Sequence, residues 1–223
     1  MISITDSHKK LSISNLNEYP LLERQRPFIE LMMKYNCALR EVSTKFEVLD
    51  DEFSIRYNRN PVESIRTRIK SPRSIVEKLE RKGYDVSIEN IRDHIHDVAG
   101  ARIICSFPED IYMLAEMFMR QDDITVVEIK DYIKNPKPSG YRSYHLIIDI
   151  PVFLTESRET MRVEVQFRTI AMEFWASLEH KLKYKKDIDS PHAEEIAHQL
   201  KECSDRIAAL DLEMQGIRNK IEE

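Results

Sequence analysis

Hydrophobic residues recur at helical spacing near the N-terminus of the chain. From about Leu21 to Phe53 they lie three or four positions apart, which predicts a long amphipathic helix or a pair of helices. The polar segment from Asn58 to Pro61 ends this pattern. A second helix is predicted to begin at Ser71-Pro72, with serine as the N-cap and proline at the first helical position, and to end at Gly83.

The central part of the chain alternates between strand-like and helical patterns. The segment from Met161 to Phe167 predicts a strand, because apolar residues alternate there with polar ones. The other predicted elements are strands at about 102–107, 124–129 and 144–150, and helices at about 88–96, 108–120 and 169–184. This order predicts an α/β or α+β fold, in which a mixed β-sheet carries helices on its faces.

The C-terminal tail has an unbroken heptad pattern over about 26 residues. Its apolar positions, spaced alternately by four and three, are Ile196, Leu200, Cys203, Ile207, Leu210, Met214, Ile217 and Ile221. A helix packed on its own domain would let such a strict period drift away from the core, so pairing with another helix fits better. That helix would come from a second subunit or from the same chain, where the N-terminal helix is a candidate.

Size and composition indicate a globular protein. The 223 residues, 42% of them hydrophobic, suit one α/β domain with appended helices, or at most two small domains. We expect no leader and no membrane anchor, since no apolar run approaches the roughly 18 residues needed to span a bilayer. Cys37, Cys105 and Cys203 are far apart, which favours reduced thiols in a cytoplasmic protein.

Positive charge is concentrated in one segment of an acidic chain. Residues 56–82 hold nine cations against three acids, whereas residues 187–223 hold ten acids against four cations. The net charge of −5 argues against broad nucleic-acid binding, such as coating of DNA. A local positive patch favours a compact polyanion such as a polyphosphate. A solvated helix face is the alternative explanation for the same run of charge.

The helix predicted to begin at Ser71 offers an anion site. Basic residues precede the free N–H groups at the start of the helix. Further basic residues and a serine hydroxyl lie along the helix itself. These residues are Arg68, Lys70, Ser74, Lys78 and Arg81.

Two carboxylates and a dense loop complete the candidate chemistry. Asp97 and Arg102 lie at the entry of a predicted strand, and Glu164 lies mid-strand on the polar face beside Gln166. Residues 130–145 combine cations, aromatic rings, a glycine and a histidine. Mg²⁺ usually takes one or two carboxylates, with phosphates and water as further ligands. Singly, a turn cap explains Asp97 and a cross-strand ion pair explains Glu164, but together the set favours nucleotide phosphoryl chemistry.

Several segments together resemble the synthetase domain of the RelA/SpoT superfamily over roughly residues 55–185. They are Arg68-Ile-Lys70, His96-Asp97-Val-Ala-Gly-Ala-Arg102, Lys130-Asp-Tyr-Ile, Lys137-Pro-Ser-Gly-Tyr-Arg-Ser-Tyr-His145, Val163-Glu164-Val-Gln166-Phe-Arg-Thr and Phe174-Trp-Ala-Ser-Leu-Glu-His180. The chain length resembles that of the stand-alone small alarmone synthetases. The segment Asn60-Pro-Val-Glu before the basic motif resembles the RelP branch more than RelQ. The resemblance implies a nucleotidyltransferase-like domain at 56–185, an N-terminal helical region at 1–55 and a C-terminal helix at 186–223 used for oligomerisation.

This resemblance implies a (p)ppGpp synthetase of the stringent response. Such an enzyme moves the β,γ-pyrophosphate of ATP to the 3′-OH of GDP or GTP and releases AMP. The catalytic residues, which would also hold Mg²⁺, would be Asp97 and Glu164. The residues that would bind ATP are Arg68, Lys70, Ser74, Lys78, Arg81, Arg102 and Lys130. Those that would bind GDP or GTP are Lys137, Tyr141, His145 and Gln166, with the tyrosine stacked on guanine.

The match has departures, and alternatives remain. Lys130 stands where many relatives have arginine, and Ser139 where asparagine is common. The hydrolase of long family members has no counterpart here, so we expect synthesis without hydrolysis. The alternatives are another nucleotidyltransferase, or a guanine-nucleotide or RNA sensor that binds without turnover. The resemblance implies homotetramers, and nothing in the sequence supports regulation by RNA.

Overall fold

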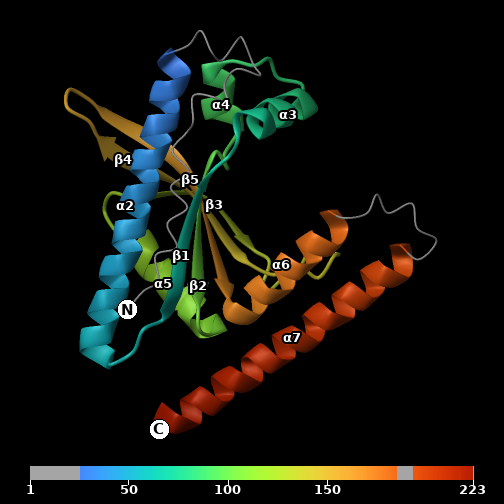
Figure 1. Ribbon diagram of the computed structural model, residues 1–223. Helices are drawn as coiled ribbons and strands as arrows, with labels where there is room; N and C mark the ends of the chain where they lie inside the picture. The colour runs from blue at the N-terminus through green and yellow to red at the C-terminus, as the bar shows by residue number, and fades with distance from the viewer. Residues whose placement is uncertain (1–25, 185–192, 223) are drawn as a thin grey trace.

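A five-stranded mixed sheet forms the centre of the protein (Figure 1). The structure, a computed structural model, describes residues 26–184 and 193–222. The strands are β1 (Val62–Ile69), β2 (Ala99–Cys105), β3 (Thr125–Asp131), β4 (Tyr144–Phe153) and β5 (Arg158–Thr169). Their order across the sheet is β1-β2-β5-β4-β3, with β2 and β5 parallel and the other neighbours antiparallel. The predicted mixed sheet with helices on its faces is therefore confirmed.

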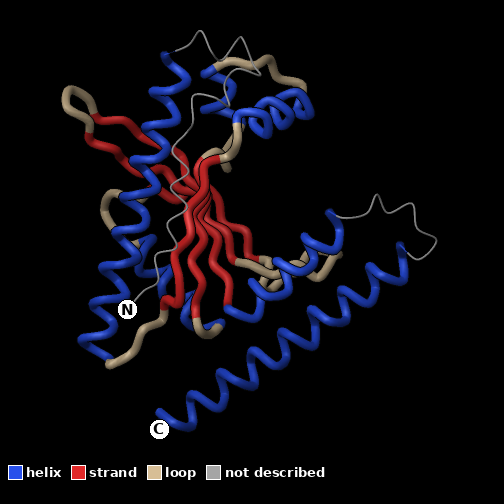
Figure 2. Tube along the Cα trace, viewed as in Figure 1, coloured by secondary structure: helices blue, strands red, loops and turns tan. Residues whose placement is uncertain are grey.

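Helices surround this sheet on several sides (Figure 2). They are α2 (Arg26–Tyr57), α3 (Pro72–Lys82), α4 (Ile88–His94), α5 (Pro108–Met119), α6 (Ile170–Tyr184) and α7 (Ala193–Glu222). The long helices α2 and α5 cover the apolar face, where Phe46 of α2 stacks on Phe118 of α5 and touches Phe167 of β5 edge-on. None of the described helices has an apolar run long enough to cross a membrane.

The boundaries of α3 follow from its own sequence. The Ser71 side chain accepts a hydrogen bond from the Ser74 N–H, Pro72 occupies the first helical position, and Gly83 ends the helix with φ of 78°. A residue with positive φ at this position lets two backbone N–H groups cap the last carbonyls, and glycine adopts that conformation without strain. The predicted start and end of this helix are confirmed.

Strand β1 was not predicted from the hydrophobic pattern. A register shift between Val62 and Ser64 interrupts the simple alternation of apolar and polar residues. Three cations in and just after the strand also hide it, because a charged segment resembles a solvated helix or loop. Asp50 of α2 fixes its start, since its carboxylate accepts hydrogen bonds from the Val62 N–H and the Asn60 amide.

α7 packs on its own chain through polar residues and leaves apolar heptad positions exposed. Ser204 and Asp211 are buried in that contact, and Gln215 and Arg218 bond to the start of α5. The most exposed heptad residues are Leu210, Met214, Ile217 and Ile221. Within the chain α7 lies along α6 and near α5, whereas α2 lies on the other side of the sheet (Figure 1). The N-terminal helix is therefore not the partner of α7 in this chain.

Candidate active site

The register of the sheet gathers the predicted site residues on one face. Residues paired across neighbouring strands project to the same side, and successive residues alternate. One row contains one residue from each of the five strands, in sheet order Arg66, Arg102, Gln166, His145 and Lys130. The next row on this face carries Arg68, Gly100 and Glu164. The opposite face holds Val163, Val165 and Phe167, so the sheet separates a polar working face from the core.

Asp97 is held by two lysines at one end of this face. It lies in the turn between α4 and β2, where its two carboxylate oxygens are 2.9 Å from Lys70 Nζ and 2.7 Å from Lys78 Nζ. Burial alone would raise the pKa of Asp97, but the hydrogen bonds and charges of the lysines outweigh it and lower the pKa. The carboxylate is therefore ionised at neutral pH, and β1, α3 and the α4–β2 turn meet around it.

Gly100 lies directly beside the Arg68 side chain. A Cβ at Gly100 would lie 3.5 Å from Cγ and Nε of Arg68, in van der Waals contact. Ser74, in the first turn of α3, bonds to Ser71, and Arg81 is exposed in the last turn of the same helix. Five of the residues predicted to bind ATP thus lie along β1 and α3, with Arg81 at the far end of the helix, whereas Arg102 lies on β2 and Lys130 on β3.

Glu164 lies in the middle of β5 and is bound from two sides. Its Oε2 accepts a hydrogen bond of 2.8 Å from Gln166, and its Oε1 is 3.2 Å from His145 Nδ1. Burial alone would raise the pKa of Glu164, but the interactions with His145 and Gln166 outweigh it and lower the pKa. The nearby charge of Asp97 opposes that lowering of the pKa.

Tyr141 connects the loop between β3 and β4 to the sheet. Its hydroxyl accepts a hydrogen bond of 2.7 Å from Arg168 and lies 3.0 Å from His145 Nε2. With its proton on Nδ1, His145 accepts from this hydroxyl and donates to Glu164. Lys137 Nζ and the Arg168 guanidinium each lie 5.0 Å from the ring centroid, within the range of cation–π contacts. A hydrogen-bonded chain therefore runs from Arg168 through Tyr141 and His145 to Glu164.

A carboxylate that the sequence analysis missed organises the arginines at the other end of the face. Glu173 of α6 is bonded by Arg66 at 3.3 Å, Arg102 at 2.9 Å and Arg168 at 2.6 Å. These arginines come from β1, β2 and β5, and Glu173 offsets their mutual repulsion. Both residues lie in or next to motifs that resemble the family, since Arg168 is within the segment 163–169 and Glu173 precedes the segment 174–180. Only the fold shows that the two side chains meet.

Lys130 lies on the edge strand β3 and away from the α3 end of the site. It is opposite His145 in the register, and its ammonium is 2.8 Å from Glu128, whose hydrogen bond raises the pKa of Lys130. The strand order thus places Lys130 beside the residues predicted to bind GDP or GTP. Its assignment to ATP stays a prediction.

The carboxylates fit a magnesium ion by the type and number of their donors. In the part of the chain that the structure describes, no group of three or more His, Cys, Asp or Glu side chains gathers as a metal site. A cation bound at Asp97 and Glu164 would need further oxygen ligands from substrate phosphates and water. Mg²⁺ binds in this manner in proteins that handle nucleotides.

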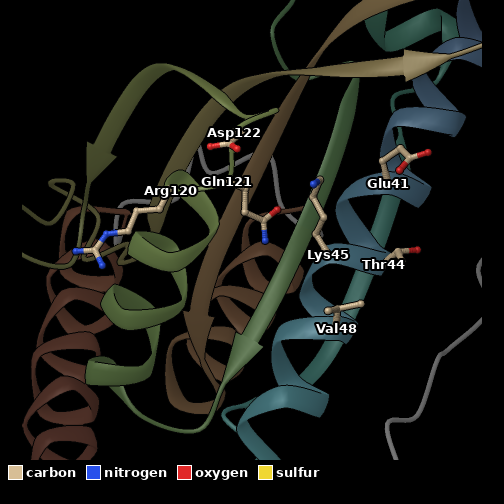
Figure 3. A pocket seen from close by; sticks show the side chains of 7 residues that line it. All are labelled: Glu41, Thr44, Lys45, Val48, Arg120, Gln121 and Asp122. Carbon is tan, nitrogen blue, oxygen red and sulfur yellow. The ribbon is translucent and has the colours of Figure 1, made fainter.

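A separate hollow of about 570 Å³ lies beside α2 and the end of α5 (Figure 3). Its lining residues are Glu41, Thr44, Lys45, Val48, Arg120, Gln121 and Asp122. None of the predicted site residues is among them. Because α2 and α5 cover the apolar face of the sheet, this hollow belongs to the opposite side of the molecule, and we assign it no part in the chemistry.

The sheet and its polar face define an α/β protein built to bind phosphate-bearing ligands. Residues 67–189 match the family model described as a region found in RelA / SpoT proteins. The GTP pyrophosphokinase YwaC of Bacillus subtilis is 44% identical over 191 residues, which cover 86% of this chain and 90% of YwaC. The chain belongs to the RelA/SpoT family, among its small alarmone synthetases.

Solved structures agree with this membership. The small alarmone synthetase 1 of Bacillus subtilis bound to its product pppGpp has a TM-score of 0.79 and 35% identity, covering 89% of this chain and 100% of that one. The same protein bound to AMPCPP has a TM-score of 0.72 and 31% identity, covering 89% and 100%. The resemblance found in the motifs and the predicted fold are thus confirmed.

Proposed function

We propose that this chain is a GTP pyrophosphokinase that makes (p)ppGpp. It transfers the β,γ-pyrophosphate of ATP to the ribose 3′-OH of GDP or GTP and releases AMP. One observation carries the proposal: a single sheet face presents Asp97 with two lysines at one end, Glu164 at its centre and the Tyr141 loop beside it. This arrangement suits two nucleotides that meet at Glu164, and the relatives that bind pppGpp and AMPCPP support it.

The donor half of the proposed site lies along β1, α3 and β2. Arg68, Lys70, Lys78 and Arg102 would neutralise the triphosphate of ATP, with Ser74 and Arg81 further along α3. Lys70 and Lys78 are paired with Asp97 before any ligand binds. When ATP enters, its phosphates compete for these ammonium groups, which leaves the Asp97 carboxylate ready for a cation. Positioning and neutralisation of charge supply most of the catalysis in phosphoryl transfer.

The acceptor half of the proposed site is the face of β4 and β5 beside Tyr141. Tyr141 would stack on guanine, with Lys137, His145 and Gln166 contacting the rest of the nucleotide. Stacking of a base on an aromatic ring contributes about 1–3 kcal/mol, judged from proteins that bind single-stranded nucleic acid. Because His145 joins Tyr141 to Glu164, a bound guanine nucleotide would also fix the orientation of that carboxylate.

Glu164 would orient the attacking 3′-hydroxyl and accept its hydrogen bond. Its pKa lies below the usual value for glutamate, which weakens it as a general base and favours its roles as ligand and positioning group. Asp97 and Glu164 would hold Mg²⁺, which supplies neutralisation of the phosphate charge when bound. His145 and Gln166 keep the Glu164 side chain in one orientation throughout.

Product analysis tests this function. We expect the protein, given Mg-ATP and GDP or GTP, to form AMP and a guanine nucleotide that carries a 3′-pyrophosphate. Release of inorganic pyrophosphate instead of AMP would identify a nucleotidyltransferase of another kind. Binding of GDP without any product would identify a sensor. Separation of labelled nucleotides by chromatography distinguishes these results in one incubation.

We also propose that the protein forms homo-oligomers through α7, with a tetramer as the number implied by the family resemblance. Four apolar heptad residues in the second half of α7, namely Leu210, Met214, Ile217 and Ile221, are at least half exposed. Exposed apolar residues on one stripe of a long helix favour pairing with a second copy. In this division, residues 56–185 are the synthetase domain, 186–223 carry the oligomerisation helix, and α2 of the 1–55 region packs on the sheet. We place the protein in the cytoplasm, where its substrates occur.

Substitution on the heptad stripe tests the assembly. We expect Met214→Glu with Ile217→Glu to lower the mass in solution, because charges at positions 50% and 51% exposed would repel a second copy while leaving the chain folded. Leu212→Glu is the matched control, since Leu212 is 59% exposed but lies outside the heptad positions. Light scattering coupled to size-exclusion chromatography measures the mass. An unchanged mass in the double variant would contradict this surface.

A further inference from the structure

The 132–143 loop, between β3 and β4, carries residues proposed to bind the guanine nucleotide. At its base the Tyr132 N–H donates to Ser143 O at 3.0 Å, and Asp131 accepts from the next two N–H groups. At its tip, Gly140 N donates to Lys137 O at 2.8 Å. These bonds shape the loop, but they do not by themselves fix its tip against the sheet.

Helix α7 makes direct polar contacts with this loop. Ser204, which is 3% exposed, donates from Oγ to Gly140 O at 2.5 Å. Arg142 donates from Nη2 to Asp205 Oδ1 at 2.9 Å and from Nη1 to Ile133 O at 3.0 Å. The guanidinium thus ties the first residues of the loop to the helix, while Ser204 holds its tip.

Gly140 permits this approach for two independent reasons. Its φ of 90° lies in the region that residues with a side chain rarely adopt. A Cβ added there would lie 2.8 Å from Ser204 Cβ and 3.2 Å from Lys201 Cα. The chain has only four glycines, so a glycine at a point of helix contact is informative. Any side chain at this position would push the loop and α7 apart.

We propose that α7 positions the guanine-nucleotide site, with Ser204 and Asp205 as positioning residues that hold Gly140 and Arg142. These two loop residues flank Tyr141, so the contacts with α7 set where its ring and hydroxyl lie. This inference rests on the proposed function, because it takes Tyr141 to be the guanine-stacking residue. It predicts that loosening α7 weakens binding of the acceptor nucleotide and leaves ATP binding intact, since Asp97 is held by Lys70 and Lys78, which lie on and before α3.

Two kinds of variant test the inference in the full chain. Gly140→Ala forces the loop away from α7. The double variant Ser204→Ala, Asp205→Asn removes the hydroxyl donor to Gly140 O and the negative charge that pairs with Arg142, without adding bulk. We expect the KM for GDP to rise roughly tenfold in each, whereas the KM for ATP stays within about twofold of wild type. Gly216→Ala is the control for the glycine, because a Cβ there meets no atom within 4 Å. Glu202→Gln is the control for the charge change, since Glu202 is exposed on the same helix.

Calorimetric titration with GDP alone separates this inference from the proposed reaction. If wild type makes no alarmone but the variants still bind GDP more weakly, the reaction assignment fails and the positioning role stands. Unchanged GDP affinity in both variants would overturn the positioning role, whatever the activity. Equal losses of GDP and ATP affinity would also overturn it, because general loosening of the fold explains such a result. Thermal melts monitored by circular dichroism accompany each variant.

Discussion

Glu164→Gln is expected to lower the rate of AMP release by about a hundredfold or more, because it removes the charge at the centre of the site. Glutamine keeps the size of the side chain but cannot hold a cation as a carboxylate does. It also leaves His145 without its charged partner. Initial rates with Mg-ATP and saturating GDP measure the effect, and the KM values show whether both nucleotides still bind.

The matched control for this change is Glu156→Gln. Glu156 is exposed in the turn between β4 and β5, so the same chemical replacement there leaves the site untouched. We expect its rate to equal that of wild type. If Glu164→Gln instead retained activity close to the control, Glu164 would have no part in the reaction, and the row of polar residues on β5 would be structural.

Asp97→Asn is expected to lower the rate by a similar factor, through a different cause. The substitution removes a ligand proposed for Mg²⁺ and also removes the shared partner of Lys70 and Lys78. The released ammonium groups would then be available to the phosphates of ATP. We therefore expect the variant to bind ATP at least as tightly as wild type in the presence of EDTA. Addition of Mg²⁺ should strengthen binding to wild type much more than to the variant.

Titration of ATP with and without Mg²⁺ measures this difference independently of turnover. Asp93→Asn is the control, because Asp93 is an exposed carboxylate in the preceding helix α4. Should Mg²⁺ strengthen ATP binding equally in Asp97→Asn and wild type, Asp97 would not hold the cation. Its bonds to the lysines would then be its whole contribution.

Local signals in the sequence predicted the elements whose ends are set by their own residues. The serine cap at Ser71 and the glycine at Gly83 fix α3 without help from distant segments. The alternation at 161–167 likewise placed β5 and its polar side. In contrast, β1 depends on pairing with β2, and neither its register shift nor its partner appears in the pattern of apolar residues.

The tail shows why a clear hydrophobic period does not say which face is buried. α7 is helical as predicted, but its contact with the chain uses Ser204 and Asp211. Their partners are Gly140 O and the Thr169 hydroxyl, which lie far away in sequence. Polar side chains can be buried when they have hydrogen-bond partners, and those partners are known only from the tertiary structure. Four heptad residues, Leu210, Met214, Ile217 and Ile221, stay exposed in this chain.

The motifs gave the chemical groups of the site but not their connections. Residue type and spacing pointed to Asp97 and Glu164, and the family resemblance pointed to Tyr141. The fold added the two lysines that share Asp97 and the hydrogen bonds that join Tyr141 to Glu164. It also added Glu173, which the sequence presents as one more acidic residue in a helix.

The row of side chains that crosses all five strands makes the site sensitive to chain length. Successive residues of a strand face opposite sides, so removal of one residue within β5 would turn Gln166 into the core and Phe167 toward the polar face. A substitution changes one side chain, whereas such a deletion reverses the remainder of the strand. The turn at 154–157 would absorb an added or lost residue, since it lies beyond the site. Among relatives, differences in length should therefore gather in turns and spare the strands.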